Sequence, residues 1–249
     1  MKLYVLSGYI QEILLVEYPD KLLLLDGCSR ADVTTVLNFI SNTLSRSPSD
    51  LKLITVTHMH PDHAGAANKL RKLTGCNIAC AKKDTQWYRG FSGKLMHITD
   101  ILLTRYVANK MQKRQRWLWY SSTLKADIQL TDGDLLPGFD DWQVLTTPGH
   151  TDRDISLYHL PSKRVYIADL IVATKKGFIP PFPIFYPNNY QKSLKKIASL
   201  APSSVILAHG GEVTITNEQI NSIQKKAPTE PMTHWRLIQS KLKQICFSR

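Results

Sequence analysis

A short stretch of the chain concentrates side chains that bind metal ions. His58, His60, Asp62 and His63 place three imidazoles and one carboxylate within six residues, directly after a strand-like run at 51–57. Neutral imidazole and carboxylate are good ligands for zinc and related divalent ions. On extended backbone the side chains at 58 and 60 project to the same side, and Asp62 and His63 can point to a second position as a helix begins. This spacing therefore predicts a metal site.

Three more side chains of the same types occur further along the chain. Each follows an apolar run that is typical of a strand: His150, Asp169 and His209. In layered α/β folds, sites gather where the ends of strands lead into loops. We therefore expect these side chains to converge on the site that the first motif begins.

Strand-like and helix-like segments mix throughout the chain, which favours α/β layers around a sheet core. Short apolar runs predict strands at 3–6, 13–18, 22–26, 51–57, 142–145, 155–160, 165–168 and 205–208. Helical spacing of apolar residues predicts helices at 33–44, 64–73, 189–200, 217–226 and 231–245. A capping box that starts at Ser29 would open the first of these helices, and Gly75 would close the second.

The motifs H-x-H-x-D-H, P-G-H-T, A-D and A-H-G, in this order, resemble those of the metallo-β-lactamase superfamily over roughly residues 20–215. The resemblance implies a single domain over 1–249 with an αββα sandwich, in which two mixed β-sheets are flanked by helices. It also implies a dinuclear metal site at one edge. No cysteine stands at the A-D position, which separates the chain from the lactamase subgroup that uses a cysteine ligand.

Carried over residue by residue, the resemblance implies two sets of ligands and a bridge between them. His58, His60 and His150 would hold the first ion, whereas Asp62, His63 and His209 would hold the second. Asp169 would bridge the two ions. Asp26, in Leu25-Asp26-Gly27, would support the site from behind the ligands.

The ligand set implies hydrolysis with two zinc ions, with manganese or iron as alternatives. Two cations that share a water lower its pKa from about 16 toward 7. Asp62 could also orient this water or shuttle its proton, which makes it the catalytic candidate. The leading hypothesis is a hydrolase of a small ester, thioester or lactone. A phosphodiesterase or nuclease is the second hypothesis, and a non-hydrolytic metal-binding or redox protein is the third.

The charge of the chain bears on its partners. The formal net charge is +12 and the isoelectric point is about 9.5, which favours anionic partners. A small-molecule substrate that could be anionic is expected, and nucleic acid is open but less favoured. No apolar run is long enough to predict a membrane span. The N-terminal segment does not read as a signal peptide, so we expect a cytoplasmic location.

The stretch at 89–125 stands apart, with eight Lys or Arg residues against one acid, Asp100. Apolar residues at helical spacing predict an amphipathic helix there, namely Leu95, Ile98, Leu102 and Tyr106. Two interpretations are open. The stretch is either a solvated helix face, or a basic helical insert that forms a lid or a partner surface over the site. An apolar aromatic loop at 177–186 could line an acyl-binding mouth or pack on the core.

Overall fold

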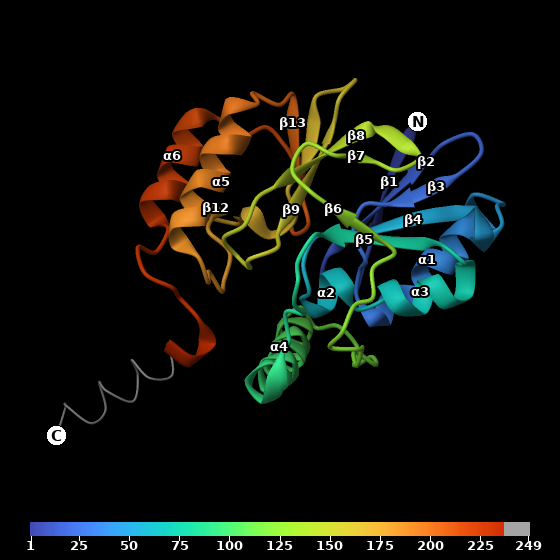
Figure 1. Ribbon diagram of the computed structural model, residues 1–249, viewed down its shortest axis with the longest axis horizontal. Helices are drawn as coiled ribbons and strands as arrows, with labels where there is room; N and C mark the ends of the chain where they lie inside the picture. The colour runs from blue at the N-terminus through green and yellow to red at the C-terminus, as the bar shows by residue number, and fades with distance from the viewer. Residues whose placement is uncertain (237–249) are drawn as a thin grey trace. The chain divides into compact units, whose positions relative to one another are not determined.

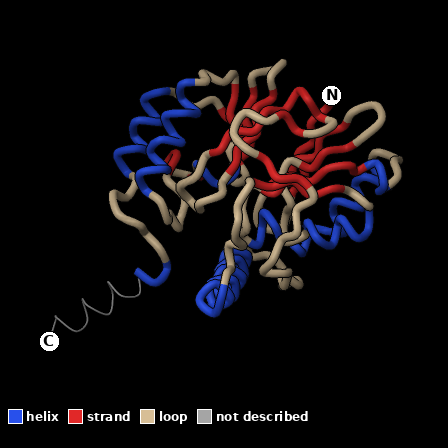
Figure 2. The backbone as a smooth tube through the Cα atoms, viewed as in Figure 1, coloured by secondary structure: helices blue, strands red, loops and turns tan. Residues whose placement is uncertain are grey.

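A computed structural model describes residues 1–236 of the 249-residue chain. These residues form two compact units, of which the first ends at Val144 and the second begins at Leu145. Each unit has its own core of buried apolar side chains. Figure 2 shows that both units combine strands with helices.

The first unit is built on a six-stranded mixed sheet with the strand order β1-β2-β3-β4-β5-β6. Its strands are β1 (Lys2–Ser7), β2 (Glu12–Glu17), β3 (Leu22–Leu24), β4 (Leu51–Val56), β5 (Asn77–Ala81) and β6 (Ile128–Leu130). Pairing is antiparallel from β1 to β3 and parallel from β3 to β6. Every residue of the inner strand β4 is buried except Lys52, because parallel strands are covered on both faces.

The helices of the first unit are η1 (Arg30–Asp32), α1 (Val33–Asn38), η2 (Phe39–Thr43), η3 (Pro48–Asp50), α2 (Pro61–Ala64), α3 (Ala67–Thr74) and α4 (Gly90–Lys110). The single helix expected at 33–44 is divided into α1 and the π-helical turn η2. Its opening residues are mostly β-branched, which lowers helix propensity. α3 packs on β4 and β5 (Figure 1) and ends at Gly75, whose φ of 77° is left-handed, as expected of a helix end.

α4 is the helix that was predicted within the basic stretch. Its buried face is not the face formed by the apolar residues whose spacing predicted the helix. The residues of its buried face are Gly93, His97, Asp100, Ile101, Thr104 and Ala108. The residues whose spacing indicated a helix are all exposed, namely Leu95, Ile98, Leu102 and Tyr106. The apolar row that predicted the helix is therefore exposed, whereas the buried face is mixed in character. The role of the helix as a lid or partner surface stays a prediction.

The second sheet is also mixed, with the strand order β14-β13-β10-β9-β8-β7. Its strands are β7 (Leu135–Leu136), β8 (Phe139–Thr146), β9 (Ile155–His159), β10 (Arg164–Tyr166), β13 (Ser204–Leu207) and β14 (Gly211–Val213), and the boundary between the units falls within β8. β10 and β13 are parallel, whereas β9 with β10 and β13 with β14 are antiparallel.

The second unit also contains the turn η4 (Ala168–Leu170), the hairpin β11 (Val172–Thr174) with β12 (Gly177–Ile179), and the helices α5 (Pro187–Ser199) and α6 (Asn217–Lys226). α5 and α6 pack side by side (Figure 1). A capping box between Thr216 and Gln219 opens α6. Most of the helix expected at 231–245 lies outside the described residues.

The fold class predicted from the sequence is confirmed, since two mixed β-sheets are flanked by helices. Within the part of the chain that the structure describes, no helix is both long and apolar enough to cross a membrane.

Candidate metal centre

The first ligand motif lies where β4 leads into α2. His58 lies between the two elements, and His60 caps α2 with extended backbone, so that Pro61 is the first helical residue. Proline suits this position because its fixed φ matches a helix start. His58, His60, Asp62 and His63 are all buried. The end of a central strand therefore delivers all four side chains to one place in the first unit.

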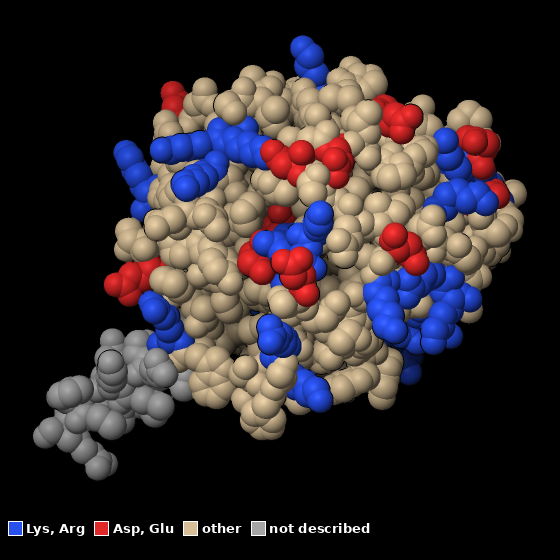
Figure 3. All heavy atoms as spheres, in the orientation of Figure 1, with Lys and Arg blue, Asp and Glu red and all other residues tan. Residues whose placement is uncertain are grey.

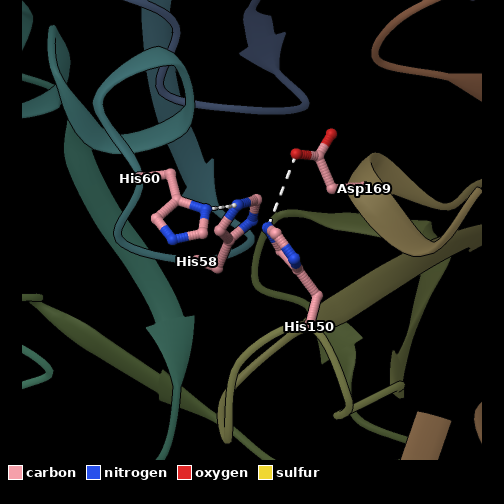
Figure 4. Close-up of side chains that lie close together, drawn as sticks. All are labelled: His58, His60, His150 and Asp169. Carbon is pink, nitrogen blue, oxygen red and sulfur yellow. Dashed lines mark hydrogen bonds and ion pairs between the residues drawn. The ribbon is translucent and has the colours of Figure 1, made fainter. Parts of the chain in front are cut away.

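His58 and His60 face each other through ring nitrogens. Nε2 of His58 lies 3.0 Å from Nδ1 of His60 (Figure 4). Thr57 Oγ1 donates to Asp26 Oδ2 over 2.7 Å, so it can accept a proton from His58 Nδ1, 3.1 Å away. This hydrogen bond places the proton of His58 on Nδ1 and its lone pair on Nε2, toward His60.

Asp26 holds His63 in a defined orientation. Its Oδ2 accepts from His63 Nδ1 over 2.6 Å, and its Oδ1 accepts from the backbone N–H groups of Gly27 and Thr57. The other nitrogen of His63, Nε2, lies 3.6 Å from Oδ2 of Asp62. The expected supporting residue is therefore in direct contact with an expected ligand.

Sequence reasoning missed the groups that connect α4 to this motif. Asp100 Oδ2 lies 3.9 Å from His60 Nε2 and accepts from Tyr88 Oη over 2.8 Å. Tyr120 donates to the backbone carbonyl of Met59, between the two facing histidines, and the hydroxyl oxygen of Tyr88 lies 3.2 Å from the same carbonyl. Burial raises the pKa of both tyrosines, so they stay protonated and can donate. The signal in the sequence that could have indicated this contact is that Asp100 is the one acid of the basic stretch.

The second unit brings together its three expected ligands. Oδ2 of Asp169 lies 3.6 Å from Nε2 of His150 (Figure 4), and Oδ1 lies 3.5 Å from Nε2 of His209. The carboxylate thus presents one oxygen to each histidine. Asp169 lies within the turn η4 after β10, whereas His209 follows β13 after one intervening residue.

The loop that carries His150 is built by contacts with two other segments. Nδ1 of His150 donates to the carbonyl of Pro183 over 2.5 Å, so the loop at 177–186 supports this histidine. Gly149 has a φ of 156°, and a Cβ there would lie 2.5 Å from Cα of Tyr190. Only glycine therefore lets α5 approach so closely.

Asp154 is a further residue that sequence reasoning missed in this loop. Its Oδ2 accepts from the backbone N–H groups of Gly149 and Thr151, over 3.1 and 2.7 Å. Its Oδ1 accepts from the hydroxyl of Thr151 over 2.5 Å. Burial raises the pKa of this carboxyl. Thr151 therefore shapes the loop through Asp154, whereas Asp152 pairs with Arg153.

All seven expected ligands belong to groups of histidine and aspartate that could hold a metal ion. The first unit contributes His58, His60, Asp62 and His63, and the second contributes His150, Asp169 and His209. Imidazole nitrogens and carboxylate oxygens suit zinc, iron and manganese. The donor chemistry therefore fits the divalent ions that the sequence predicted.

Comparison with known proteins agrees with the fold. The family described as Metallo-beta-lactamase superfamily matches residues 8–209, and the chain belongs to this superfamily. It is 24% identical over 221 residues to the "Probable metallo-hydrolase YqjP" of Bacillus subtilis, which covers 77% of this chain and 67% of that protein.

Two more comparisons extend this picture. The chain is 24% identical over 188 residues to a "Hydroxyacylglutathione hydrolase" of Cereibacter sphaeroides, covering 75% of this chain and 58% of that protein. Its fold is similar to the crystal structure of the metallo-beta-lactamase family protein TTHA1429 from Thermus thermophilus, with a TM-score of 0.69 and 17% identity. That match covers 90% of this chain and 78% of the other.

Proposed function

We propose that this protein is a hydrolase that holds two divalent metal ions, zinc in the first place and manganese or iron as alternatives. In this proposal the first ion is held by His58, His60 and His150. The second ion is held by Asp62, His63 and His209. Asp169 would contribute a carboxylate oxygen to each ion.

The facing nitrogens of His58 and His60 are the observation that carries the proposal. The hydrogen bond to Thr57 leaves the lone pair of His58 on Nε2, 3.0 Å from Nδ1 of His60. Asp100 near Nε2 of His60 favours the proton on that nitrogen, which leaves the lone pair of His60 on Nδ1. Two lone pairs that face each other repel unless a cation or a proton lies between them. A divalent ion satisfies both at once.

Two other proposed ligands share this arrangement, in which one ring nitrogen donates a hydrogen bond and the other keeps a lone pair. His63 and His150 each use Nδ1 to donate to an oxygen, from Asp26 and from Pro183 respectively. Both therefore keep a lone pair on Nε2, the nitrogen that lies near an acidic ligand. Proteins commonly orient metal-binding histidines in this way, through a carboxylate or a carbonyl on the far nitrogen.

Asp169 has the geometry of a bridging ligand. Its two oxygens face two different histidines, Oδ2 toward His150 and Oδ1 toward His209, at nearly equal distances of 3.6 and 3.5 Å. In the proposal His150 belongs to the first ion and His209 to the second. One carboxylate can therefore serve both ions.

The chemistry of the proposed reaction divides between the ions and the protein. Two bound divalent ions would lower the pKa of a water and polarise the carbonyl or phosphoryl group of the substrate. Asp62 would orient that water and take up its proton at a carboxylate oxygen. Asp26 and Asp100 would keep His63 and His60 in orientations that direct a lone pair at an ion. Tyr88 would hold Asp100 by donating to its carboxylate.

Small esters, thioesters and lactones are the substrates that we favour. The relatives named above include a hydrolase of an acylated thiol, by its printed name, and this supports a carbonyl electrophile. A phosphodiester is the second candidate, because the net charge of +12 favours a polyanion.

A panel of chromogenic substrates tests the proposed function. Metal-loaded protein would be assayed against a thioester, a lactone, a β-lactam and a phosphodiester, beside Asp62→Asn and the control Asp20→Asn. Asp20 is exposed between β2 and β3, so its loss should leave activity unchanged. We expect turnover of the ester-type substrates that the Asp62 variant lacks. Turnover of the phosphodiester alone would favour the second candidate, and equal activity in both variants would contradict the proposal.

A further inference from the structure

The segment at 89–120 has an exposed surface of unusual composition. Its apolar side chains include Phe91, Leu102 and Trp117, which are 85%, 55% and 70% exposed. Five of them recur along one side of α4, namely Phe91, Leu95, Ile98, Leu102 and Tyr106. Met111 and Trp117 are exposed after the helix, and Trp119 is exposed while its ring packs against His97 on the other face of α4. Exposed apolar side chains that occur singly are ordinary, but a continuous row marks an interaction surface.

Cations surround this apolar row. Lys94, Arg105, Lys110, Arg114 and Arg116 are all exposed. The one acid of the segment, Asp100, lies on the opposite, buried face of α4, near His60. The exposed surface of 89–120 therefore offers positive charge and apolar area with no negative charge. Positive charge alone does not distinguish it, since the face drawn in Figure 3 shows Lys and Arg side chains in several other places too.

We propose that this surface, formed by α4 and residues 111–120, binds the protein peripherally to a membrane that contains anionic lipids. The row from Phe91 to Tyr106 extends about 22 Å along the helix, at 1.5 Å per residue. A helix that lies in the membrane interface inserts such a row among the acyl chains while Lys and Arg contact the headgroups. Tryptophan, here the 70% exposed Trp117, suits this boundary because its ring is amphipathic.

Other binding partners would match only one of the two properties of this surface, either its apolar row or its positive charge. A second copy of the chain would cover the apolar row but would bring the same cations against each other. Nucleic acid would neutralise the cations but would leave Phe91, Ile98 and Leu102 exposed to water. An anionic bilayer satisfies both properties, and it leaves the Asp100 face of α4 packed on the metal-binding motif.

Sedimentation with lipid vesicles tests the proposal on the full chain. One set of vesicles consists of phosphatidylcholine, and the other of equal parts of phosphatidylcholine and phosphatidylglycerol. The variants are Phe91→Ser with Leu102→Ser for the apolar row, and Arg105→Glu with Lys110→Glu for the cations. The matched controls are Leu73→Ser with Leu135→Ser, which are exposed apolar residues elsewhere, and Lys72→Glu with Lys82→Glu.

The expected result is binding to the anionic vesicles that weakens with salt. The apolar variant should weaken it roughly tenfold or more, since two large apolar side chains leave the lipid. The charge variant should also weaken it, while both control pairs should bind as the unmodified protein does. The proposal is wrong if the protein does not sediment with anionic vesicles, or if the control pairs lose as much binding. It is also wrong if the protein does not bind vesicles and light scattering shows a dimer that the apolar variant dissociates. Binding to a single-stranded oligonucleotide without binding to vesicles would likewise contradict it.

Discussion

Nδ1 of His63 lies 2.6 Å from Oδ2 of Asp26, and this carboxylate is itself fixed by Thr57 and by two backbone N–H groups. A carboxylate that accepts this many hydrogen bonds is held in one orientation. It therefore keeps the proton of His63 on Nδ1 and the lone pair on Nε2. The strand ends β3 and β4 thereby prepare a ligand before any ion binds.

Asp26→Asn should weaken metal binding without unfolding the protein. The amide keeps the shape of the side chain but loses the charge that orients His63. Changes to such supporting carboxylates commonly lower metal affinity by about 10–100-fold. Competition with a chromogenic chelator measures the affinity, with Asp20→Asn as the control. Equal affinities in Asp26→Asn and in the control would show that Asp26 does not orient a ligand.

Asp62→Ala should abolish hydrolysis while the fold stays intact. Asp62 lies in the first turn of α2, where it fills no part of the apolar core. Loss of a ligand or a proton acceptor should reduce turnover by about 10² or more. Turnover of the best panel substrate is measured together with circular dichroism. Activity within about tenfold of the unmodified protein would exclude the assigned role.

Asp100→Ala should affect metal binding through His60. We expect a weaker affinity, with rescue by Asp100→Glu in part, because a longer carboxylate can still approach Nε2 of His60. The readout is again chelator competition, since a purely structural role would change thermal stability and leave affinity alone. An affinity that stays constant while stability falls would assign Asp100 to packing only.

The ligand residues could be predicted from the sequence because four of them stand within one motif and three follow apolar runs. Their anchors could not all be found in this way. The oxygen that holds His150 is the backbone carbonyl of Pro183, and a carbonyl has no signature in the side-chain pattern. The sequence does not distinguish Asp154 from other aspartates, because its role depends on the hydrogen bonds that it accepts from Gly149 and Thr151.

The packing of α4 shows a second limit of sequence patterns. Its apolar residues occur on both sides of the helix, so spacing predicted the helix but not its buried face. Tertiary contacts determine which face of α4 is buried, because Asp100 and His97 on this helix pack against Tyr88 and Tyr120. The helix expected at 33–44 is present, but its second half is a π-helical turn, which the apolar spacing did not predict.

Asp32 should make stability depend on pH. Burial is the main cause that raises its pKa to about 6, from 3.8. The folded state therefore binds the proton more tightly than the unfolded state, so the stabilisation is complete below about pH 4 and is lost as the pH rises through about 6. Asp32→Asn removes this loss. The melting temperature of the unmodified protein should fall relative to that of the variant, on the order of 5 °C by pH 8.

Differential scanning fluorimetry in the presence of a chelator measures both proteins across this pH range, with Asp20→Asn as the control. The chelator removes any contribution of bound metal to the melting temperature. Melting curves of Asp32→Asn that stay parallel to those of the unmodified protein from acid to alkaline pH would show that Asp32 does not carry this dependence.

The number of metal ions bound by each chain tests the central claim most directly. Protein purified without chelator and saturated with zinc would be desalted and analysed by elemental analysis, with His58→Ala and Asp169→Ala beside it. Seven ligands exceed what one tetrahedral ion uses, so we expect about two zinc ions per chain. The His58 variant should retain about one, and the Asp169 variant should bind both less tightly. Less than about half an equivalent in the unmodified protein would contradict the account, since no arrangement of these ligands then holds an ion.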